Sequence, residues 1–399
     1  MMSGTSYTVA IYSGNIPSTT FIENLIEGMS EKGLRILLFG KKLKDVSYKE
    51  NVEIIATPQS ELPLILFVIK EAGKLYFKNR NKLSKLLTSV KARNKSFRYF
   101  VKDLGAILPI LNAAPDIFHI QWAKTLQVYP ELMQLLDSKI AVSLRGAHIN
   151  YSPLNDPELA EAYRSHFPKV DAFHAVSNAI SSEAQKYGAV SNKIYVIHSS
   201  VRDSLLIGDV HPKIKGTKLE ILSVGRFHWK KGYHYGLDTM NMLKESKIDF
   251  HYTIVAQGDV PEEITFLMKE YDLSNEVTII PGLQYGTLID KLKSSHVLLL
   301  PSVEEGIANV VLEAMAVGVP VITTDCGGMN EVVTDELNGF IVKVRNPEAV
   351  AQKISALLGK TENELSLMTS HAREKIRNEF SRQGQIEQFH SFYNKLATE

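Results

Sequence analysis

The sequence predicts an α/β protein built from two doubly wound parallel sheets, and three observations support this fold class. Short apolar runs alternate with segments of helical periodicity along the chain. These runs are continuous, which is typical of parallel strands whose two faces are both covered by helices. The length of 399 residues exceeds one ordinary domain, because domains usually hold about 100–200 residues.

The N-terminal half begins with a predicted strand over Tyr7–Tyr12. A helix follows over Thr20–Glu31, since its apolar residues share one face at helical spacing. Further apolar runs of strand length continue the alternation. The strands expected in this half are Leu34–Phe39, Val52–Ala56, Ile117–Ile120, Ile140–Leu144, Ala172–Val176 and Ile194–Ile197.

The alternation restarts near Leu219, after a polar segment with glycine and proline over Ser199–Lys218 that predicts a linker. We therefore expect an N-terminal domain over 1–205, a C-terminal domain over 206–381, and a final helix over 382–399 that packs back on the first domain. Two such domains leave a cleft between the C-terminal edges of their sheets, where ligands of doubly wound folds bind. The strands expected in the second half are Leu219–Val224, Tyr252–Val255, Val277–Ile280, His296–Leu300, Val319–Thr323 and Phe340–Val342.

The composition excludes several classes of protein. With 45 basic and 44 acidic residues the net charge is +1, so a nucleic-acid partner is not expected. The single cysteine, Cys326, rules out an internal disulfide and favours a reducing compartment. No basic residue precedes Lys32, so the positively charged start that a secretion signal requires is missing. The longest apolar run, Leu62–Ile69, is too short to span a bilayer. We expect a cytoplasmic protein.

One segment, Lys70–Lys102, departs from this balance. It contains eleven basic residues and one acid, so it carries +10 against −9 for the rest of the chain. Leucines and a valine at 83, 86, 87 and 90 share one helical face. Three interpretations stay open: a surface for anionic lipid, a solvated lysine-rich helix with an ordinary core face, and a site for a polyanionic substrate.

The region Pro301–Gly328 carries the strongest chemical signal. A buried strand ends at Pro301, and the loop after it holds the carboxylates Glu304 and Glu305. A helix over about Ala308–Val317 follows, and the free amides at its start suit a diphosphate. Glu313 lies within this apolar helix, so its carboxylate needs a polar partner, and ribose hydroxyls are candidates.

A second region opens the C-terminal half, where the strand Leu219–Val224 leads into Gly225, Arg226 and then Lys231. Gly225 permits close backbone approach, Arg226 offers a bidentate fork to phosphate oxygens, and Lys231 offers a point charge. A third candidate is His148, in the segment that follows the strand Ile140–Leu144.

Other signals are missing. The turn after the first strand lacks G-x-G-x-x-G, which disfavours a dinucleotide oxidoreductase. There is no G-x-S-x-G, so a hydrolase nucleophile elbow is unsupported. His228 and His234 have no convincing companions for a metal site. No metal site and no cofactor is therefore expected.

Taken together, these residues resemble the retaining glycosyltransferases of the GT-B fold, family four. The segment Glu305–Ala316 matches the family closely, and Gly327–Gly328, Glu331 and Asn338–Phe340 continue its pattern in order. The strong resemblance covers about Leu219–Val350. Residues Pro17–Ile22 look more loosely like transferases of bacterial exopolysaccharide assembly.

The resemblance implies two Rossmann-like domains, an acceptor domain and a donor domain, with roles for particular residues. The catalytic residues would be Glu305, Arg226, Lys231 and His148. The nucleotide-sugar donor would be held by Glu313, Gly306, Ile307, Ala308, Asn309 and Gly225, and the acceptor side would include Gly14, Asn15 and Arg145.

The expected function is metal-independent transfer of a hexosyl group, with retention, from a nucleotide-diphosphate sugar to a glycan or lipid-linked acceptor in bacterial surface polysaccharide assembly. The protein could rest on the inner membrane face through Lys70–Lys102. Two alternatives stay open: a GT-B nucleotide-sugar epimerase, and a non-catalytic nucleotide-sugar-binding partner in a glycan assembly complex.

Overall fold

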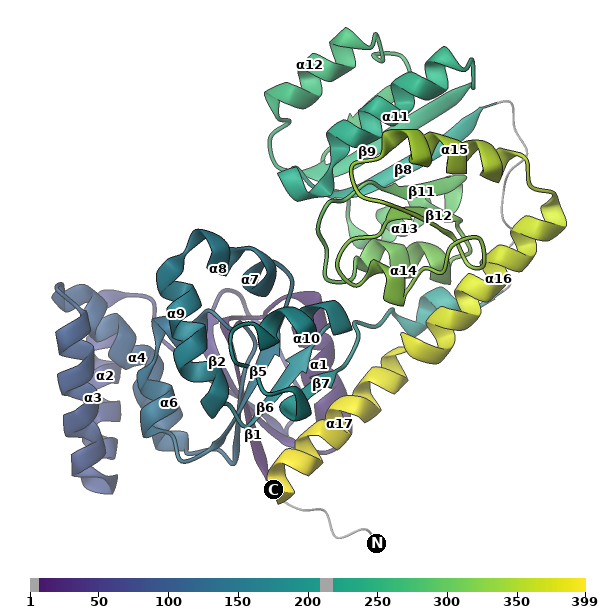
Figure 1. The fold of residues 1–399 in the computed structure, drawn as a ribbon. Coiled ribbons are helices and arrows are strands. Elements are labelled where there is room, and N and C mark those ends of the chain that lie inside the picture. The colour runs from purple at the N-terminus through teal and green to yellow at the C-terminus, as the bar shows by residue number, and fades with distance from the viewer. Residues whose placement is uncertain (1–6, 209–217) are drawn as a thin grey trace, which may run out of the picture. The chain divides into compact units, whose positions relative to one another are not determined.

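The computed structural model describes residues 7–208 and 218–399, and these fall into two compact units (Figure 1). Unit 1 comprises Met1–Val176, Ile180–Ile197 and Ile386–Glu399, and unit 2 comprises Ser177–Ala179 and His198–Gln385. Each unit is a parallel sheet covered by helices on both faces, which confirms the predicted fold class. Residues 209–217 of the predicted linker lie outside the described part of the chain.

The sheet of unit 1 has seven strands in the order β3-β2-β1-β4-β5-β6-β7, and each neighbouring pair is parallel. The order reverses between β1 and β4, which marks the switch point of a doubly wound sheet. The strands are β1 (Thr8–Ile16), β2 (Arg35–Lys42), β3 (Val52–Ala56), β4 (Ile117–Ile120), β5 (Lys139–Leu144), β6 (Ala172–Ala175) and β7 (Ile194–Val196).

Two apolar layers sandwich this sheet because successive side chains of a strand point to opposite faces. In β1, Ala10 packs on one face, while Val9 and Ile11 pack on the other. The larger helices of the first face are α2 (Glu61–Lys78), α3 (Arg80–Arg93), α4 (Phe97–Ala113), α9 (Pro157–His166) and α10 (Asn178–Gln185), and those of the second are α1 (Thr20–Glu31) and α17 (Arg382–Thr398).

A buried chain of hydrogen bonds joins α17 to the sheet of unit 1. Tyr393 Oη lies 2.6 Å from His119 Nδ1, and His119 Nε2 lies 2.9 Å from Ser143 Oγ. Ser143 Oγ lies 2.9 Å from His174 Nδ1, and His174 Nε2 lies 2.9 Å from the Ile197 carbonyl oxygen. A carbonyl can only accept, so every proton in the chain must point from Tyr393 towards Ile197. Burial, with a smaller effect of Arg145, lowers the pKa of His119 to about 3 and keeps it neutral.

The sheet of unit 2 has six parallel strands in the order β10-β9-β8-β11-β12-β13. Its strands are β8 (Leu219–Arg226), β9 (Phe250–Gln257), β10 (Val277–Ile280), β11 (Val297–Leu300), β12 (Val321–Thr324) and β13 (Phe340–Val342). Its longer helices are α11 (Tyr233–Glu245), α12 (Glu262–Glu270), α13 (Tyr285–Ser294), α14 (Asn309–Ala316), α15 (Pro347–Leu358) and α16 (Glu362–Glu379). The strands predicted from the sequence are all present, with ends shifted by a few residues.

The boundary of unit 2 differs from the range written for the predicted domains. Val201 and Leu205 are buried in the core of unit 2, and Val201 bridges to Ser381. Residues 198–205 therefore belong with the second unit, although the sequence analysis placed them in the first. The reason is packing: this polar-looking segment contributes two apolar side chains to a core that the sequence pattern does not reveal.

Ser177–Ala179 also joins unit 2, and Glu331 explains why. The Glu331 carboxylate accepts hydrogen bonds from the Asn178 amide at 3.0 Å, the Ala179 amide at 3.2 Å and His198 Nε2 at 3.0 Å. Burial alone raises the pKa of Glu331, but the hydrogen bonds from His198 and the two amides outweigh it and lower the pKa. The ionised carboxylate thus ties this short segment to the second unit.

The apolar face predicted within Lys70–Lys102 is part of the core. Leu83, Leu86 and Val90 on α3 are all buried in unit 1, so the leucine face of this segment is not available to a lipid surface. This supports the ordinary core interpretation for α3. The exposed apolar side chains of the region lie on its two neighbouring helices, chiefly on α2, with Phe97 and Tyr99 on α4.

Candidate active site

The topology of unit 2 brings together the loop after β8, which carries cations, and the loop after β11, which carries carboxylates. β8 and β11 are hydrogen-bonded neighbours, and the strand order reverses between them. Arg226 ends β8, and Pro301 directly follows β11. Because the C-terminal ends of parallel strands meet at one edge of the sheet, segments about 75 residues apart in sequence lie side by side at the switch point.

Lys231 and Glu305 form the central contact of this edge. Lys231 Nζ donates to Glu305 Oε1 across 2.6 Å, and Ser302 Oγ donates to the same oxygen at 3.0 Å. Lys230 Nζ lies 3.7 Å from Glu304 Oε2 and 3.9 Å from Glu305 Oε2. Glu305 is buried, so its charge is compensated by these partners rather than by water.

Three glycines make the close approach of these loops possible. A Cβ on Gly225 would lie 2.9 Å from Lys231 Cε, so its absence leaves room for the lysine chain. Gly232 has a φ of +61°, and its Cβ would lie 2.1 Å from the Pro301 carbonyl oxygen. Gly327 has a φ of +57°, and its Cβ would lie 1.6 Å from the Glu305 carbonyl oxygen. Larger residues at these positions would displace the loops that carry Lys231 and Glu305.

The start of α14 presents backbone amides beside this pair. The helix begins at Asn309, and no side chain of its N-cap, Ala308, hydrogen-bonds to it. The first amides of a helix have no acceptor within the helix, and they carry its positive dipole end. The preceding loop is held by the Gly328 amide, which donates to the Gly306 carbonyl oxygen at 2.7 Å. The loop Gly306–Ala308 therefore leads into a helix start that has no side-chain cap, which is the kind of geometry that suits an anion.

Glu313, on α14, has polar partners that the sequence analysis did not identify. Burial raises the pKa of Glu313 to about 7, against the lowering effects of Arg202 and a hydrogen bond from Tyr285. The Arg202 guanidinium lies 3.9 Å from the centre of the Tyr285 ring. No sequence signal pointed to Tyr285 or Arg202, because both are distant in the chain and meet Glu313 only through packing.

Arg226 differs from the two lysines because it is exposed and forms no ion pair with any described residue. Arg226 lies near the two lysines, because the charges of all three residues affect the pKa of the same side chain, His228. Burial lowers the pKa of His228, and the charges of Lys230, Arg226 and Lys231 lower it further. The edge thus offers one unpaired guanidinium next to two partly neutralised ammonium groups.

The remaining predicted site residues lie in unit 1. His148 is on the short helix α7 (Ala147–Asn150), and burial, followed by Lys124 and Arg145, lowers its pKa to about 4. Its Nδ1 is buried and has no hydrogen-bond partner in the described part of the chain. Arg145 stacks 4.1 Å over the Phe21 ring and donates to Gln121 at 3.1 Å.

Gly14 and Asn15 lie at the end of β1, where the register with β2 shifts. Gly14 lines a cavity of unit 1, whereas Asn15, Arg145 and His148 are not among the residues that line it. No group of three or more histidine, cysteine, aspartate or glutamate residues placed to hold a metal ion occurs within residues 7–208 and 218–399.

The fold and this site together define a class of protein. Two doubly wound parallel sheets, one with a lysine–glutamate pair and a helix start at its switch point, are the features expected of GT-B glycosyltransferases. Residues 209–375 match the family described as glycosyl transferases group 1. The matched region, which holds the sheet of unit 2, belongs to this family, and its motifs resemble family four of the retaining GT-B glycosyltransferases.

Individual relatives agree with this membership. The putative colanic acid biosynthesis glycosyltransferase of Escherichia coli is 27% identical over 92% of this chain and 94% of its own length. The amylovoran biosynthesis glycosyltransferase of Erwinia amylovora is 26% identical over 76% of this chain and 78% of its own length. Both are named for the biosynthesis of a polysaccharide.

Solved structures match over nearly the whole chain. Sucrose-phosphate synthase of Thermosynechococcus elongatus superposes with a TM-score of 0.75 at 16% identity, covering 98% of this chain and 99% of that one. The Anabaena protein HepE, solved with UDP and glucose, superposes with a TM-score of 0.68 at 15% identity, covering 98% and 100%. At these identities the likeness shows the GT-B fold.

Proposed function

We propose that this glycosyltransferase moves a hexosyl group, with retention, from a nucleotide-diphosphate sugar to a glycan or lipid-linked acceptor in bacterial surface polysaccharide assembly. The observation that carries the proposal is the ion pair between Lys231 and the buried Glu305, beside the exposed Arg226, at the switch point of unit 2. The two relatives named for polysaccharide synthesis support the assembly role. The complex of HepE with UDP and glucose supports a nucleotide-sugar donor.

The chemistry follows from charge. The bond between the anomeric carbon and the diphosphate oxygen breaks, and the acceptor oxygen bonds to the same face of that carbon. The acceptor proton passes to the leaving diphosphate. Arg226, Lys231 and the amides at the start of α14 stabilise the negative charge that develops on the diphosphate, in place of a metal ion. Glu313 binds the ribose of the donor.

A product analysis tests this function. Nucleotide-diphosphate sugars that raise the melting temperature are first selected, because binding to the folded state stabilises it. The selected donor is then incubated with a lipid-linked sugar acceptor, and the new linkage is examined by NMR. We expect the anomeric configuration of the donor in the product. An inverted linkage contradicts retention. If the donor is epimerised when no acceptor is present, the epimerase alternative is favoured. If no donor is turned over, the non-catalytic alternative is favoured.

The Glu313 assignment predicts a pH dependence of donor binding. A carboxylate accepts hydrogen bonds from ribose hydroxyls best when it is ionised, and the pKa of the Glu313 carboxyl is about 7 without ligand. Donor affinity should therefore fall by up to tenfold per pH unit below about 7 and level off above it. Calorimetry with the intact nucleotide-diphosphate sugar measures this, because its phosphates keep their charge over this range. Glu313→Gln should abolish the dependence, and a wild-type profile without any slope would remove Glu313 from the site.

We propose further that the protein docks on an anionic membrane, through α2 rather than the leucine face of α3. None of the helices in the described residues has both the length and the apolar character of a membrane span. On α2, however, the apolar side chains Leu62, Leu66, Ile69 and Phe77 are exposed by 75%, 67%, 62% and 88% and share one stripe at helical spacing. Such exposure of large apolar side chains in a row is typical of an interaction surface.

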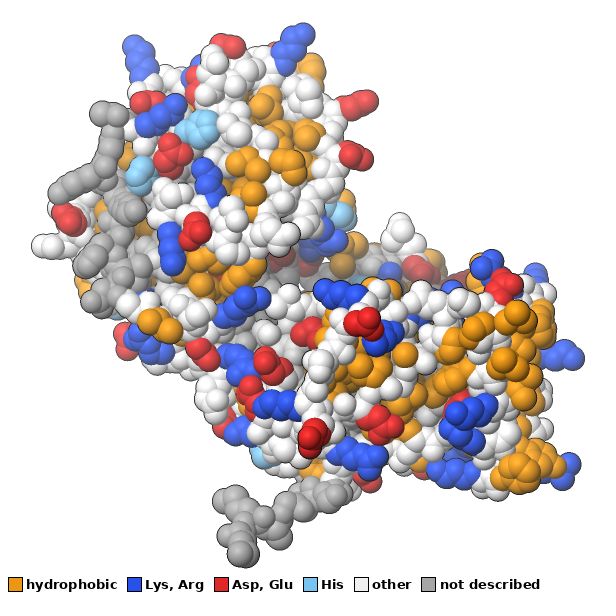
Figure 2. Space-filling model, turned by 180° about the vertical axis from the view of Figure 1, so that it is seen from behind, with side chains coloured by type: hydrophobic (Ala, Val, Ile, Leu, Met, Phe, Trp, Pro, Cys, Tyr) orange, Lys and Arg blue, Asp and Glu red, His pale blue; other side chains and the backbone are white. Residues whose placement is uncertain are grey.

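Basic side chains flank this α2 stripe. Lys70, Lys74 and Lys78 follow one another along the next part of the helix surface and are all exposed. Figure 2 shows apolar side chains interleaved with lysines and arginines over the part of unit 1 that holds α2 to α4, at the right of the view. An apolar stripe bordered by cations complements an anionic bilayer, where side chains enter the interface and ammonium groups meet lipid phosphates.

Sedimentation with vesicles tests the docking. The double variant Leu66→Ser, Phe77→Ser should bind anionic vesicles at least tenfold more weakly than wild type, because each buried apolar side chain contributes about 1.5–3 kcal/mol. The matched control is Phe266→Ser, Leu367→Ser, which removes two side chains of similar exposure from unit 2. Wild-type protein that stays in the supernatant at low salt, or a control that loses as much binding, would rule out α2 as the docking surface.

A further inference from the structure

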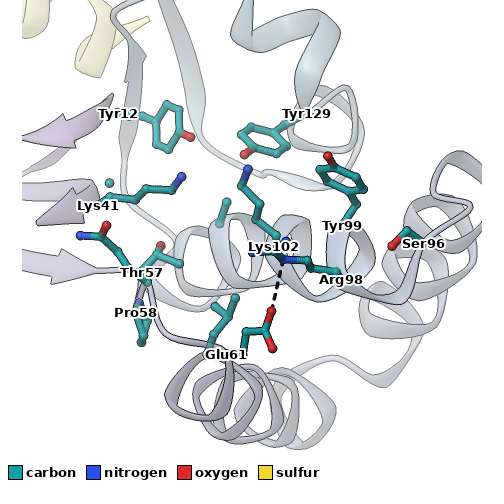
Figure 3. Close-up of a pocket in the computed structure, with 15 residues that line it drawn as sticks. Tyr12, Lys41, Thr57, Pro58, Glu61, Ser96, Arg98, Tyr99, Lys102 and Tyr129 are labelled. Carbon is teal, nitrogen blue, oxygen red and sulfur yellow. Dashed lines mark ion pairs between the residues drawn. The ribbon is translucent and has the colours of Figure 1, made fainter.

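Unit 1 contains a cavity of about 600 Å³ that the chemistry above does not use (Figure 3). Its walls come from the ends of β1 and β2, the loop after β3, and the helices α2 and α4. The volume is that of a typical small-ligand site. The lining residues are Tyr12, Gly14, Gly40, Lys41, Thr57, Pro58, Gln59, Glu61, Leu64, Ser96, Arg98, Tyr99, Lys102, Ala106 and Tyr129.

The charge of this cavity is unbalanced. Its cations are Lys41, Arg98 and Lys102, and Glu61 is its one lining acid. Arg98 Nε pairs with Glu61 Oε1 at 3.3 Å. Neither Lys41 nor Lys102 forms an ion pair with a residue in the described part of the chain. Two ammonium groups therefore share one cavity without a carboxylate to neutralise them.

The two lysines also converge. Figure 3 shows Lys41 reaching in from the sheet and Lys102 from α4, with both ammonium groups directed towards the space below Tyr12 and Tyr129. Lys41 is half-buried and Lys102 is exposed. Like charges that approach one another repel, so an anion between them would lower the free energy of the arrangement. A phosphoryl group, with several oxygens, can accept from both ammonium groups at once.

The rest of the lining suits a sugar. Tyr12 and Tyr129 pack edge to face with ring centres 6.0 Å apart, and the Tyr12 hydroxyl hydrogen-bonds to Tyr129. Tyr99 adds a third ring, over which Lys102 Nζ lies at 5.8 Å. Aromatic faces and hydroxyls next to cations match a ligand that has both a sugar ring and a phosphate.

One helix, α2, contributes both to this cavity and to the stripe proposed for membrane docking. Glu61 and Leu64 at the start of α2 line the cavity, while Leu62 and Leu66 on the same two turns belong to the exposed stripe. Residues two apart in a helix point to opposite sides, so the cavity and the stripe occupy opposite faces of the same two turns of α2. This neighbourhood favours an acceptor that carries a lipid.

We propose that this cavity binds the phosphoryl or diphosphoryl group at the reducing end of the acceptor saccharide, through Lys41 and Lys102. The inference rests on the proposed glycosyl transfer and names the substrate class of its acceptor, a sugar phosphate or a lipid-linked sugar diphosphate. Gly14, which the resemblance assigns to the acceptor side, lines the same cavity.

Calorimetric titration with inorganic pyrophosphate tests the site and separates it from the donor site. Wild-type protein should show two classes of binding. The double variant Lys41→Gln, Lys102→Gln should weaken one class at least tenfold, and Arg226→Ala should weaken the other. The control Lys44→Gln, Lys91→Gln removes two exposed lysines that do not line the cavity. If the Lys41, Lys102 variant titrates like this control, the cavity assignment is overturned, whereas an unaffected Arg226→Ala would instead contradict the donor site.

Two competing ligands then distinguish the sources of the phosphate. A soluble hexose 1-phosphate and a lipid-linked hexose diphosphate in neutral detergent should both displace pyrophosphate from the class that depends on Lys41 and Lys102. We expect the lipid-linked compound to bind more tightly and to lose this advantage in Leu66→Ser, Phe77→Ser. Equal affinities would support the cavity with a soluble sugar phosphate as its ligand. Displacement by neither compound would overturn the proposal.

Discussion

Replacing Lys231 or Arg226 by alanine should lower the rate of transfer by about 30- to 1,000-fold. This corresponds to about 2–4 kcal/mol of lost transition-state stabilisation, as for the removal of one preorganised charge donor. Lys231 is held in place by Glu305 at 2.6 Å before any ligand binds, so it needs little reorganisation in the reaction. Arg226 is exposed and unpaired in the described residues, so it loses no protein partner when it binds the diphosphate. The rate is measured as kcat at saturating donor and acceptor.

Two comparisons make this result specific. Lys293→Ala removes an exposed lysine of α13 and should leave the rate unchanged. Since Lys231→Ala also leaves the buried Glu305 short of a partner, its melting temperature is measured alongside, and Lys231→Arg keeps the charge without the same geometry. Rates within threefold of wild type in both alanine variants would contradict the assignment of these cations to the leaving diphosphate.

The second large effect is expected for Gly327→Ala. An alanine there adopts a left-handed conformation at a cost of about 1–2 kcal/mol, and displacing a packed neighbour costs about 1–3 kcal/mol more. The neighbour is the Glu305 carbonyl oxygen, 1.6 Å from the added Cβ, so the loop that positions the Glu305 carboxylate must move. We expect a loss of about 2–5 kcal/mol in the unfolding free energy and a loss of turnover.

Gly258→Ala is the matched control for this variant. Gly258 also lies in unit 2 and has a positive φ, of +99°, but its Cβ would meet nothing closer than 4.0 Å. It therefore reports the conformational cost without the collision. Urea unfolding measures both variants, and transfer assays show whether activity follows. Equal stability and equal activity in the two variants would show that the Glu305 loop tolerates the shift and is not held by Gly327.

Much of the fold can be read from local patterns. Every strand follows from a short continuous apolar run, and the helix Thr20–Glu31 follows from apolar residues on one face. These patterns work because both faces of each sheet are buried, so strand composition reports burial directly. The boundary near residue 198 could not be predicted in this way, because Val201 and Leu205 enter the second core from a polar stretch.

The sequence predicted the candidate site most directly where its residues are neighbours in the chain. Glu305, Gly306 and the start of α14 are contiguous, so their spacing alone predicts an anion site. Tyr285 and Arg202 were missed because they reach Glu313 only through packing. Lys41 and Lys102 were missed for the same reason, since one ends a strand and the other lies on a helix about 60 residues later.

The sequence alone determined the family, the two parallel sheets and the loops that carry Arg226, Lys231 and Glu305, because periodicity and contiguous motifs are local properties of the chain. Only the tertiary structure decided which apolar helix faces in and next to the basic segment are buried and which are exposed. It buried Leu83, Leu86 and Val90 in the core and left the apolar stripe of α2 exposed beside its lysines. Amphipathic periodicity shows that a helix has an apolar face, but only packing decides whether that face meets a core or remains open to another partner.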